Sequence, residues 1–556
     1  MKKACSLLLT FLLLFSVMLP AFGEEELPGA TNESEPQRIE MKSAGDVPVI
    51  VLSGDGNDIF DADGNKAYSF PYALAAMITG EEGVIPDDFD LKESFLTVLK
   101  AYIKGAITAD EDKFYDALQA EVAKLTDRIQ MDENGEPRYG TDIAASFYEI
   151  NRRSTSVPNP DGPYETGDYH FWYDWRRSPL EIADQLDAYI EGICAMTGKE
   201  QIGVVGRCLG SNFVLAYLAK YGYKNRICGL GLDCGMMHGQ DAISESFSGK
   251  FASDGDAIQR YLTDMDVTLD SWIVDLINFM EASGMFDNMN ASVKAPIYAR
   301  VAKGVTSALS LSTLATIPGY WSCVSNRDYN NALLYVFGKP GSEKRQKYAG
   351  LIEKIEAYHN QVQLGMDDLI RRFAADGGKI AVVSKYGFQL MPMCVSRNAV
   401  ADSYVSVGNS SMGATTSAIY NTLEDDYIRG RIASGLDKYI SPDKQIDAST
   451  CMFPDCTWFF RGIEHNRWTL FEDRLFYTVL TADRQYTVDD FPYSQFIVRD
   501  EEGIYHPMSA ENHHTEHWEA TDPATLTFFD RVARFFETLR KLIGDLFLWI
   551  GGKMKS

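Results

Sequence analysis

Short apolar runs alternate with amphipathic stretches along the first half of the chain. The runs are rich in β-branched residues and bounded by turn residues, which is typical of strands buried in a parallel sheet. These predicted strands cover residues 47–52, 169–175, 201–206 and 226–232. Helices are predicted at 179–197, where Ser178 precedes Pro179, and at 211–221. Such alternation predicts an α/β architecture, in which helices cover both faces of a mostly parallel central sheet.

Two long stretches with helical periodicity interrupt this alternation. Residues 82–160 are mostly helical in pattern, with a turn at Asp132-Glu133-Asn134-Gly135, and residues 236–377 contain no convincing strand. Strand patterns return at 379–384 and at 457–462, the second of which is predicted to be the last strand. We therefore expect a core in two parts, with a helical cap between them. The expected parts are 44–235, with its insertion at 82–160, the cap 236–377, and 378–480.

The N-terminal end has the pattern of a secretory signal. Lys2 and Lys3 precede a short apolar run that ends at Ala21-Phe22-Gly23, so residues 1–23 are predicted to be a signal peptide. An uncleaved anchor is the alternative. Residues 24–43 are polar and predicted to be a flexible leader. This pattern predicts a secreted or extracytoplasmic protein.

Residues 481–556 are expected to form a C-terminal extension. Within it, residues 528–550 repeat apolar side chains every three and four positions and carry Arg and Lys on the other face. This is the pattern of an amphipathic helix, which either packs on the core or contacts a membrane surface.

Composition narrows the class of protein further. The chain has 556 residues and a net charge of −27, which argues against a nucleic-acid partner. It contains nine cysteines, of which Cys5 lies in the predicted signal peptide. Disulfides between Cys451 and Cys456 or between Cys228 and Cys234 are compatible with export, and buried free thiols are the alternative.

Residues 206–210 carry the strongest chemical signal. Their sequence, Gly-Arg-Cys-Leu-Gly, lies between a predicted strand and a predicted helix and matches the nucleophile elbow G-x-S-x-G with Cys in place of Ser. Cys208 is therefore the predicted nucleophile. The backbone amides of Leu209 and of Asp55, which follows the first strand, are the predicted oxyanion donors. The alternative is a glycine-rich turn around a structural cysteine.

A thiol nucleophile needs a base and an acid downstream in the chain. His465 follows the strand at 457–462 and is the predicted base. Asp402 follows the strand at 379–384 and is the predicted acid, which would orient the imidazole. Asp233, at the end of an earlier strand, is the alternative acid.

Three other motifs give weaker signals. Ser411, in the stretch 409–413, resembles a second elbow but lacks the first glycine. His513 and His517 are spaced like a metal pair without a third ligand. Residues 61–65 fail the register of a calcium loop and predict a β-turn instead. The sequence therefore predicts neither a metal nor a cofactor.

Several of these motifs together resemble one enzyme family. Residues 173–176, Tyr-Asp-Trp-Arg, followed by Ser178-Pro179, together with the elbow and the opening strand with its glycine-bearing loop, resemble the lecithin:cholesterol acyltransferase-like α/β-hydrolases. The resemblance runs in patches from about residue 47 to 466. It implies an α/β-hydrolase fold, with Cys208, Asp402 and His465 in the triad positions. Cys208 departs from the usual serine of that family.

The resemblance also implies acyl transfer or ester hydrolysis on lipid-like substrates. A cysteine elbow is similar to those of dienelactone hydrolases and polyhydroxyalkanoate synthases as well, but the coenzyme A thioesters of the synthases are cytoplasmic. We therefore expect an exported enzyme that forms a covalent acyl-enzyme on an apolar ester or thioester. The alternative is a lipid-binding protein that has the same fold and no turnover.

Overall fold

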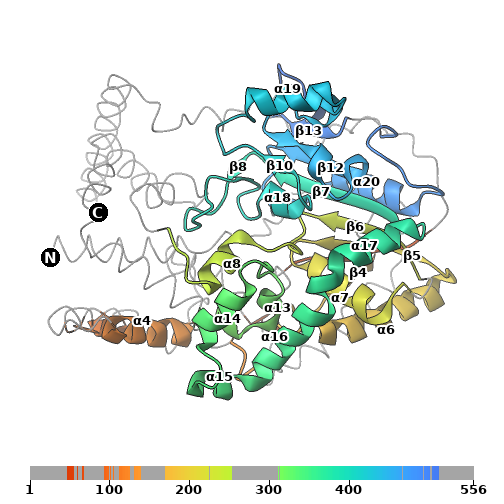
Figure 1. Ribbon diagram of the computed structural model, residues 1–556. Helices are drawn as coiled ribbons and strands as arrows, with labels where there is room; N and C mark the ends of the chain where they lie inside the picture. Colours follow the sequence, from red (N-terminus) through yellow and green to blue (C-terminus); the bar gives the residue numbers. More distant parts are fainter. Residues whose placement is uncertain are drawn as a thin grey trace, which may run out of the picture.

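The structure is a computed structural model of the whole chain (Figure 1). It describes residues 47–54, 59–60, 66–67, most of 93–104, 112–125, 130–138, 169–252 except 224–225, and 311–512 except 312, 466, 492–493 and 501–503. The predicted signal peptide and leader, Asp55, His513, His517 and the amphipathic stretch 528–550 lie outside these residues.

An eight-stranded sheet forms the centre of the protein, in the order β14-β13-β12-β7-β6-β5-β1-β4 (Figure 1). All neighbouring strands are parallel except β13 and β14. The strands are β1 (Val49–Leu52), β4 (Tyr169–His170), β5 (Ile202–Arg207), β6 (Ile227–Asp233), β7 (Lys379–Tyr386), β12 (Thr457–Arg461), β13 (Phe496–Arg499) and β14 (Tyr505–Pro507). The predicted α/β architecture with a mostly parallel sheet is confirmed.

Both faces of the sheet are buried, which explains why its strands are apolar throughout. Ile50 and Leu52 of β1 face the side that packs against α6 (Pro179–Thr197) and α7 (Gly210–Tyr221). Val49 and Val51 face the opposite side, which packs against α20 (Leu470–Thr481). α6 spans the predicted helix residue for residue, although the Ser178 side chain makes no capping hydrogen bond.

The described part of 236–377 is helical, as predicted. Its helices are α8 (Asp241–Phe247), α13 (Pro318–Trp321), α14 (Tyr329–Phe337), α15 (Glu343–Lys347), α16 (Ala349–Gln361) and α17 (Met366–Ala375). α16 and α17 contact α7, so this block packs over the helical layer formed by α6 and α7 (Figure 1). In the first insertion the structure describes α4 (Asp112–Leu125) and a turn at 132–135.

Two of the predicted strand boundaries are wrong. The strand predicted at 169–175 has only two residues, because the chain leaves the sheet after His170 and turns at 174–177. The strand at 457–462 is not the last one, because β13 and β14 extend the sheet beyond the boundary predicted at residue 480. These two strands are short, and only three residues of β13 are apolar.

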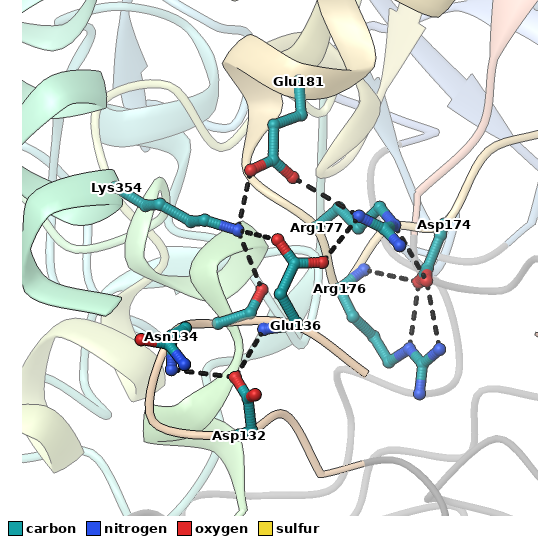
Figure 2. A network of polar contacts seen from close by, with 9 residues as sticks. Asp132, Asn134, Glu136, Asp174, Arg176, Arg177, Glu181 and Lys354 are labelled. Carbon is teal, nitrogen blue, oxygen red and sulfur yellow. Dashed lines mark hydrogen bonds and ion pairs between the residues drawn. The ribbon is translucent and has the colours of Figure 1, made fainter. Parts of the chain in front are cut away.

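The Tyr-Asp-Trp-Arg segment that follows β4 connects parts of the chain that are distant in sequence. Arg176 is fully buried and donates from Nε and Nη2 to the two oxygens of Asp174 at 2.9 and 3.0 Å (Figure 2). The hydroxyl of Tyr173 donates to the carbonyl of Ser53, after β1, and the amide of Gly319 donates to the carbonyl of Arg176. This segment therefore connects the edge of the sheet to α13, and its role in the described structure is to hold these two elements together.

A polar network next to this segment holds the turn at 132–135 against two helices (Figure 2). Lys354 of α16 forms ion pairs with Glu136 and with Glu181 of α6. Arg177 forms an ion pair with Glu136 at 2.9 Å. The turn itself has Gly135 at φ +71° and a hydrogen bond from its amide to the carbonyl of Asp132, so the predicted turn is confirmed.

The eight cysteines after Cys5 are all buried free thiols, which answers the question that the sequence left open. Neither of the two candidate disulfides is present among the described residues. β2 (Ile59–Phe60) pairs antiparallel with β3 (Lys66–Ala67), and residues 61–65, predicted to form a β-turn, lie outside the described residues. In the described part of the chain, no helix combines the length and the apolar character that a membrane span needs.

Candidate active site

Cys208 occupies a strained turn between β5 and α7. Its φ is +54°, a left-handed conformation that non-glycine residues seldom adopt. A Cβ atom on Gly206 would lie 2.5 Å from Cα of Ser211, and one on Gly210 would collide with the carbonyl oxygen of Leu52. The two glycines of the motif are therefore required by the close passage of strand, turn and helix.

Hydrogen bonds hold this turn in place. The amide of Cys208 donates to the carbonyl of Asp233 at 2.9 Å, and Ser211 Oγ donates to the carbonyl of Cys208 at 2.7 Å. Ser211 Oγ also accepts from the amide of Met236. Met236 in turn places its sulfur 3.8 Å from Cys208 Sγ and 3.7 Å from Cys323 Sγ. The thiol of Cys208 is 4% exposed and lies in largely apolar surroundings.

The loop after β1 runs directly against the thiol. A Cβ atom on Gly54 would lie 2.8 Å from Cys208 Sγ and 3.4 Å from the amide nitrogen of Leu209. Among the described residues, the Leu209 amide donates no backbone hydrogen bond, so it is available to an oxyanion. Asp55, the other predicted donor, follows Gly54 and lies outside the described residues.

Asp402 and His465 form a buried pair. Nδ1 of His465 lies 2.7 Å from Oδ2 of Asp402, and both side chains are at most 2% exposed. Oδ1 of Asp402 accepts from the amides of Tyr404 and Val405 at 2.9 and 2.7 Å. Burial alone raises the pKa of a carboxyl, but the imidazole and these amides outweigh it, so the pKa of Asp402 is lowered. Asp402 therefore stays ionised and holds the imidazole with its proton on Nδ1.

Asp233, the alternative acid, lies in a different environment. Neither of its carboxylate oxygens has a hydrogen-bond partner, and the nearest cation is Arg207, whose Nε lies 3.4 Å away. Burial raises the pKa of Asp233. The structure thus brings Asp402, and not Asp233, into hydrogen-bond contact with His465.

The nucleophile and the base are not joined by a hydrogen bond. Nε2 of His465 is buried and has no hydrogen-bond partner among the described residues, Cys208 included. Since Nδ1 donates to Asp402, Nε2 carries the lone pair of the imidazole. The structure therefore contains a thiol on an elbow and an oriented imidazole with an unused lone pair, but no hydrogen bond joins the two side chains.

A buried charge cluster fastens the loop that carries His465, and the sequence pattern did not reveal it. Lys385 of β7 is fully buried, donates to the carbonyl of Arg467 at 2.6 Å and pairs with Glu472 of α20 at 2.9 Å. Its Nζ lies 4.0 Å from the ring centroid of Trp468, and the guanidinium of Arg207 lies 5.0 Å from the same centroid. Burial raises the pKa of Glu472 to about 7, although Lys385 opposes this shift.

A second thiol lies beside the Asp402–His465 pair. Cys234 follows β6 at φ +47° and is fully buried. Its Sγ, a carboxylate oxygen of Asp402 and a ring nitrogen of His465 all lie within 4.8 Å of one another. No local pattern indicates this proximity, because Cys234 follows β6 and Asp402 lies in the long connection after β7, the strand that pairs with β6.

The second predicted elbow does not present a nucleophile. The hydroxyl of Ser411 donates to the carbonyl of Val407 at 2.5 Å and accepts from the amide of Ala414 at 3.0 Å. Ser411 is also fully buried. Its hydroxyl therefore has a structural role in closing α18 (Val407–Ser410).

No family model, curated protein or solved structure matches this chain. The chemistry of the site is therefore inferred from its own geometry.

Proposed function

We propose that the protein is an α/β-hydrolase that transfers an acyl group, or hydrolyses an ester or thioester, on a lipid-like substrate. Three features of the fold support the α/β-hydrolase assignment: the position of the elbow directly after β5, the helix that follows it, and the chain order Cys208, Asp402, His465. The single observation that carries the proposal is the buried Asp402–His465 pair, 2.7 Å between Oδ2 and Nδ1, with an unpartnered Nε2.

The proposed reaction begins with proton transfer from Cys208 Sγ to Nε2 of His465. The thiolate then attacks the carbonyl carbon of the substrate, and the negative charge on the carbonyl oxygen is stabilised by the Leu209 amide and the loop after β1. The bond to the leaving alkoxide or thiolate breaks, and the leaving group takes the proton from the imidazolium. The product of this half-reaction is a thioester on Cys208.

In the second half-reaction, His465 accepts a proton from water or from an acceptor alcohol. The resulting nucleophile attacks the thioester, and Cys208 leaves as a thiolate that recovers its proton from the imidazolium. Asp402 keeps its charge throughout and stabilises the imidazolium. Hydrolysis and acyl transfer differ only in the acceptor.

An apolar acyl chain is the substrate class that the surroundings of Cys208 favour. Met236, Leu209 and Phe213 belong to the same apolar cluster as the thiol, and the family resemblance points to lipid esters as well. With the predicted signal peptide and the stretch 528–550, we further propose a secreted or extracytoplasmic protein that contacts a membrane surface.

The test is acyl-enzyme formation. The wild-type protein and the Cys208→Ala variant are incubated with p-nitrophenyl butyrate, and intact-mass spectrometry follows the addition of one butyryl group. Cys228→Ala, which removes another buried thiol on β6, is the matched control. Labelling of wild type and control but not of Cys208→Ala is expected, and undiminished labelling of Cys208→Ala would remove the proposal. Lipid profiling of the same pair then identifies the natural acyl donor.

A second candidate function is lipid binding without turnover. The observation that favours it is the missing hydrogen bond between Cys208 and His465, together with the close contact of Cys208 Sγ with Met236 Sδ. In that case a fluorescent fatty acid binds wild type and Cys208→Ala equally well, and neither protein becomes acylated.

A further inference from the structure

We propose that Cys234, Asp402 and His465 form a binding site for Zn²⁺ that competes with the use of His465 as a base. The binding site rests on the described geometry alone. Its inhibitory effect rests on the proposed function. The remaining buried thiols and charge clusters of the described residues do not bring three metal-ligating side chains together in this way.

The geometry is close to what a zinc site requires. Zinc binds cysteine sulfur at about 2.3 Å and histidine nitrogen or carboxylate oxygen at about 2.0–2.2 Å, so ligand atoms in a tetrahedral site are about 3.3–3.8 Å apart. The three ligand atoms here lie within 4.8 Å of one another. An ion between them therefore needs side-chain shifts on the order of 1 Å, which rotation about χ angles can supply without backbone movement.

The donor types suit zinc rather than calcium or magnesium. One thiolate, one imidazole and one carboxylate are borderline-soft ligands, whereas calcium and magnesium select oxygen atoms alone. The thiol of Cys234 loses its proton to water when the ion binds. The charges of the thiolate and the carboxylate then balance those of Zn²⁺, which a site without solvent exposure requires.

The two ring nitrogens of His465 offer two ways to bind an ion. Nδ1 lies 2.7 Å from Oδ2 of Asp402, so an ion on Nδ1 replaces that hydrogen bond. Nε2 is buried without a hydrogen-bond partner among the described residues. Three protein ligands leave the fourth tetrahedral position to a water molecule that enters with the ion.

The consequence for catalysis follows from the ligand set. An ion on Nε2 occupies the lone pair that has to accept the proton of Cys208, and an ion on Nδ1 leaves the proton of the neutral ring on Nε2, with the same result. An ion on Asp402 removes the carboxylate that orients the ring. Each of these contacts stops acylation without any contact to Cys208. Cys234 has no part in the proposed acyl transfer, so zinc binding gives this thiol a role of its own.

The test measures metal binding directly. Full-length wild type, Cys234→Ala, Cys234→Ser, Cys208→Ala and Cys228→Ala are treated with chelator, dialysed and titrated with Zn²⁺ against a chromophoric chelator. Co²⁺ replaces Zn²⁺ in a second titration, in which a near-ultraviolet sulfur-to-cobalt charge-transfer band reports a cysteine ligand. A third sample of each protein is expressed with added zinc and analysed for bound metal, so that slow entry into the buried site does not hide binding.

We expect one zinc ion per chain in wild type, Cys208→Ala and Cys228→Ala, with the charge-transfer band present. In both Cys234 variants the affinity falls by about 100-fold or more and the band disappears, because a primary ligand is lost. Zinc-free wild type, or a band that survives in both Cys234 variants, would overturn the inference. A band lost in Cys208→Ala would also overturn it, because it would assign the sulfur ligand to the nucleophile.

A final measurement separates the two proposals. The rate of acylation by p-nitrophenyl butyrate is measured with and without Zn²⁺, and each protein is compared with its own zinc-free rate. Zinc suppresses acylation of wild type and Cys228→Ala by at least about tenfold and has much less effect on Cys234→Ser. If zinc binds through Cys234 but the protein is never acylated, the proposed function alone is rejected. If the protein is acylated at the same rate with and without zinc, the proposed inhibition alone is rejected.

Discussion

Replacement of Asp402 by asparagine tests the acid–base pair without changing its shape. In the wild type, Oδ1 of Asp402 accepts two backbone hydrogen bonds from Tyr404 and Val405, and Oδ2 faces Nδ1 of His465 at 2.7 Å. An asparagine at this position has to keep its oxygen toward the two amides, because the alternative orientation would place its NH₂ group against two N–H donors. The NH₂ group of the new side chain would then face the imidazole.

This orientation reverses the tautomer of His465. A donor opposite Nδ1 favours an imidazole that carries its proton on Nε2, and such an imidazole cannot accept the proton of Cys208. Loss of the carboxylate that fixes the tautomer of a catalytic imidazole lowers kcat by about 10⁴-fold. That loss corresponds to about 5 kcal/mol of transition-state stabilisation. We therefore expect acylation of the Asp402→Asn variant to be slower by about 10³- to 10⁴-fold.

The assay is the release of p-nitrophenolate in the first turnover, followed by stopped-flow absorbance with protein in excess. Asp233→Asn is the matched control, since Asp233 is an equally buried carboxylate one strand away and forms no hydrogen bond with His465. We expect it to acylate faster than Asp402→Asn by about 100-fold or more, because the Asp233 carboxylate has no hydrogen bond to His465 and does not fix its tautomer. A rate for Asp402→Asn within about tenfold of wild type, or a slower rate for Asp233→Asn, would refute this role of Asp402.

Three further predictions concern geometry and stability. Gly54→Ala places a methyl group within van der Waals overlap of Cys208 Sγ, so acylation should fall by about 100-fold at nearly unchanged thermal stability, measured by labelling and by circular dichroism. Arg176→Met leaves Asp174 buried without its main cation and should cost about 3–5 kcal/mol of unfolding free energy in urea, whereas Lys354→Met, in a partly exposed network, should cost about 1 kcal/mol. Burial raises the pKa of Glu472 from 4.5 to about 7, so between these pH values the folded chain binds one proton more than the unfolded chain. The free energy of unfolding should therefore fall by up to about 3 kcal/mol as the pH rises through this range, and Glu472→Gln should flatten the pH dependence measured by urea unfolding.

The sequence alone was enough to predict those parts of the fold and the site that depend on residue types within one segment. β1, β5, β6 and β7 are apolar on both faces because helices cover both sides, so their positions could be predicted within two residues. The elbow at 206–210 could be predicted because its two glycines are required by a close backbone passage. Asp402 and His465 could be selected because they lie in the connections that follow β7 and β12, and the strands of a parallel sheet end at one edge.

The remaining features depend on contacts between distant parts of the chain. β13 gains its place from pairing with β12, and β14 from pairing with β13, which their weak local patterns do not reveal. The ion pair between Lys385 and Glu472 joins β7 to α20 across 87 positions, and in the sequence each residue has the pattern of an ordinary exposed charge. Cys234 comes beside Asp402 through the pairing of β6 with β7 and the long connection that follows β7.

The charge cluster behind the elbow has a direct bearing on a thiol nucleophile. In the proposed acylation, formation of a thiolate on Cys208 leaves a positive imidazolium at His465, which nearby negative charge stabilises and nearby positive charge opposes. Lys385 is a buried cation in this region and pairs with Glu472 at 2.9 Å. The loop that carries His465 is thus fastened by a buried cation that bonds to the carbonyl of Arg467 and pairs with Glu472 of α20, so loss of Lys385 should displace the imidazole of the proposed base.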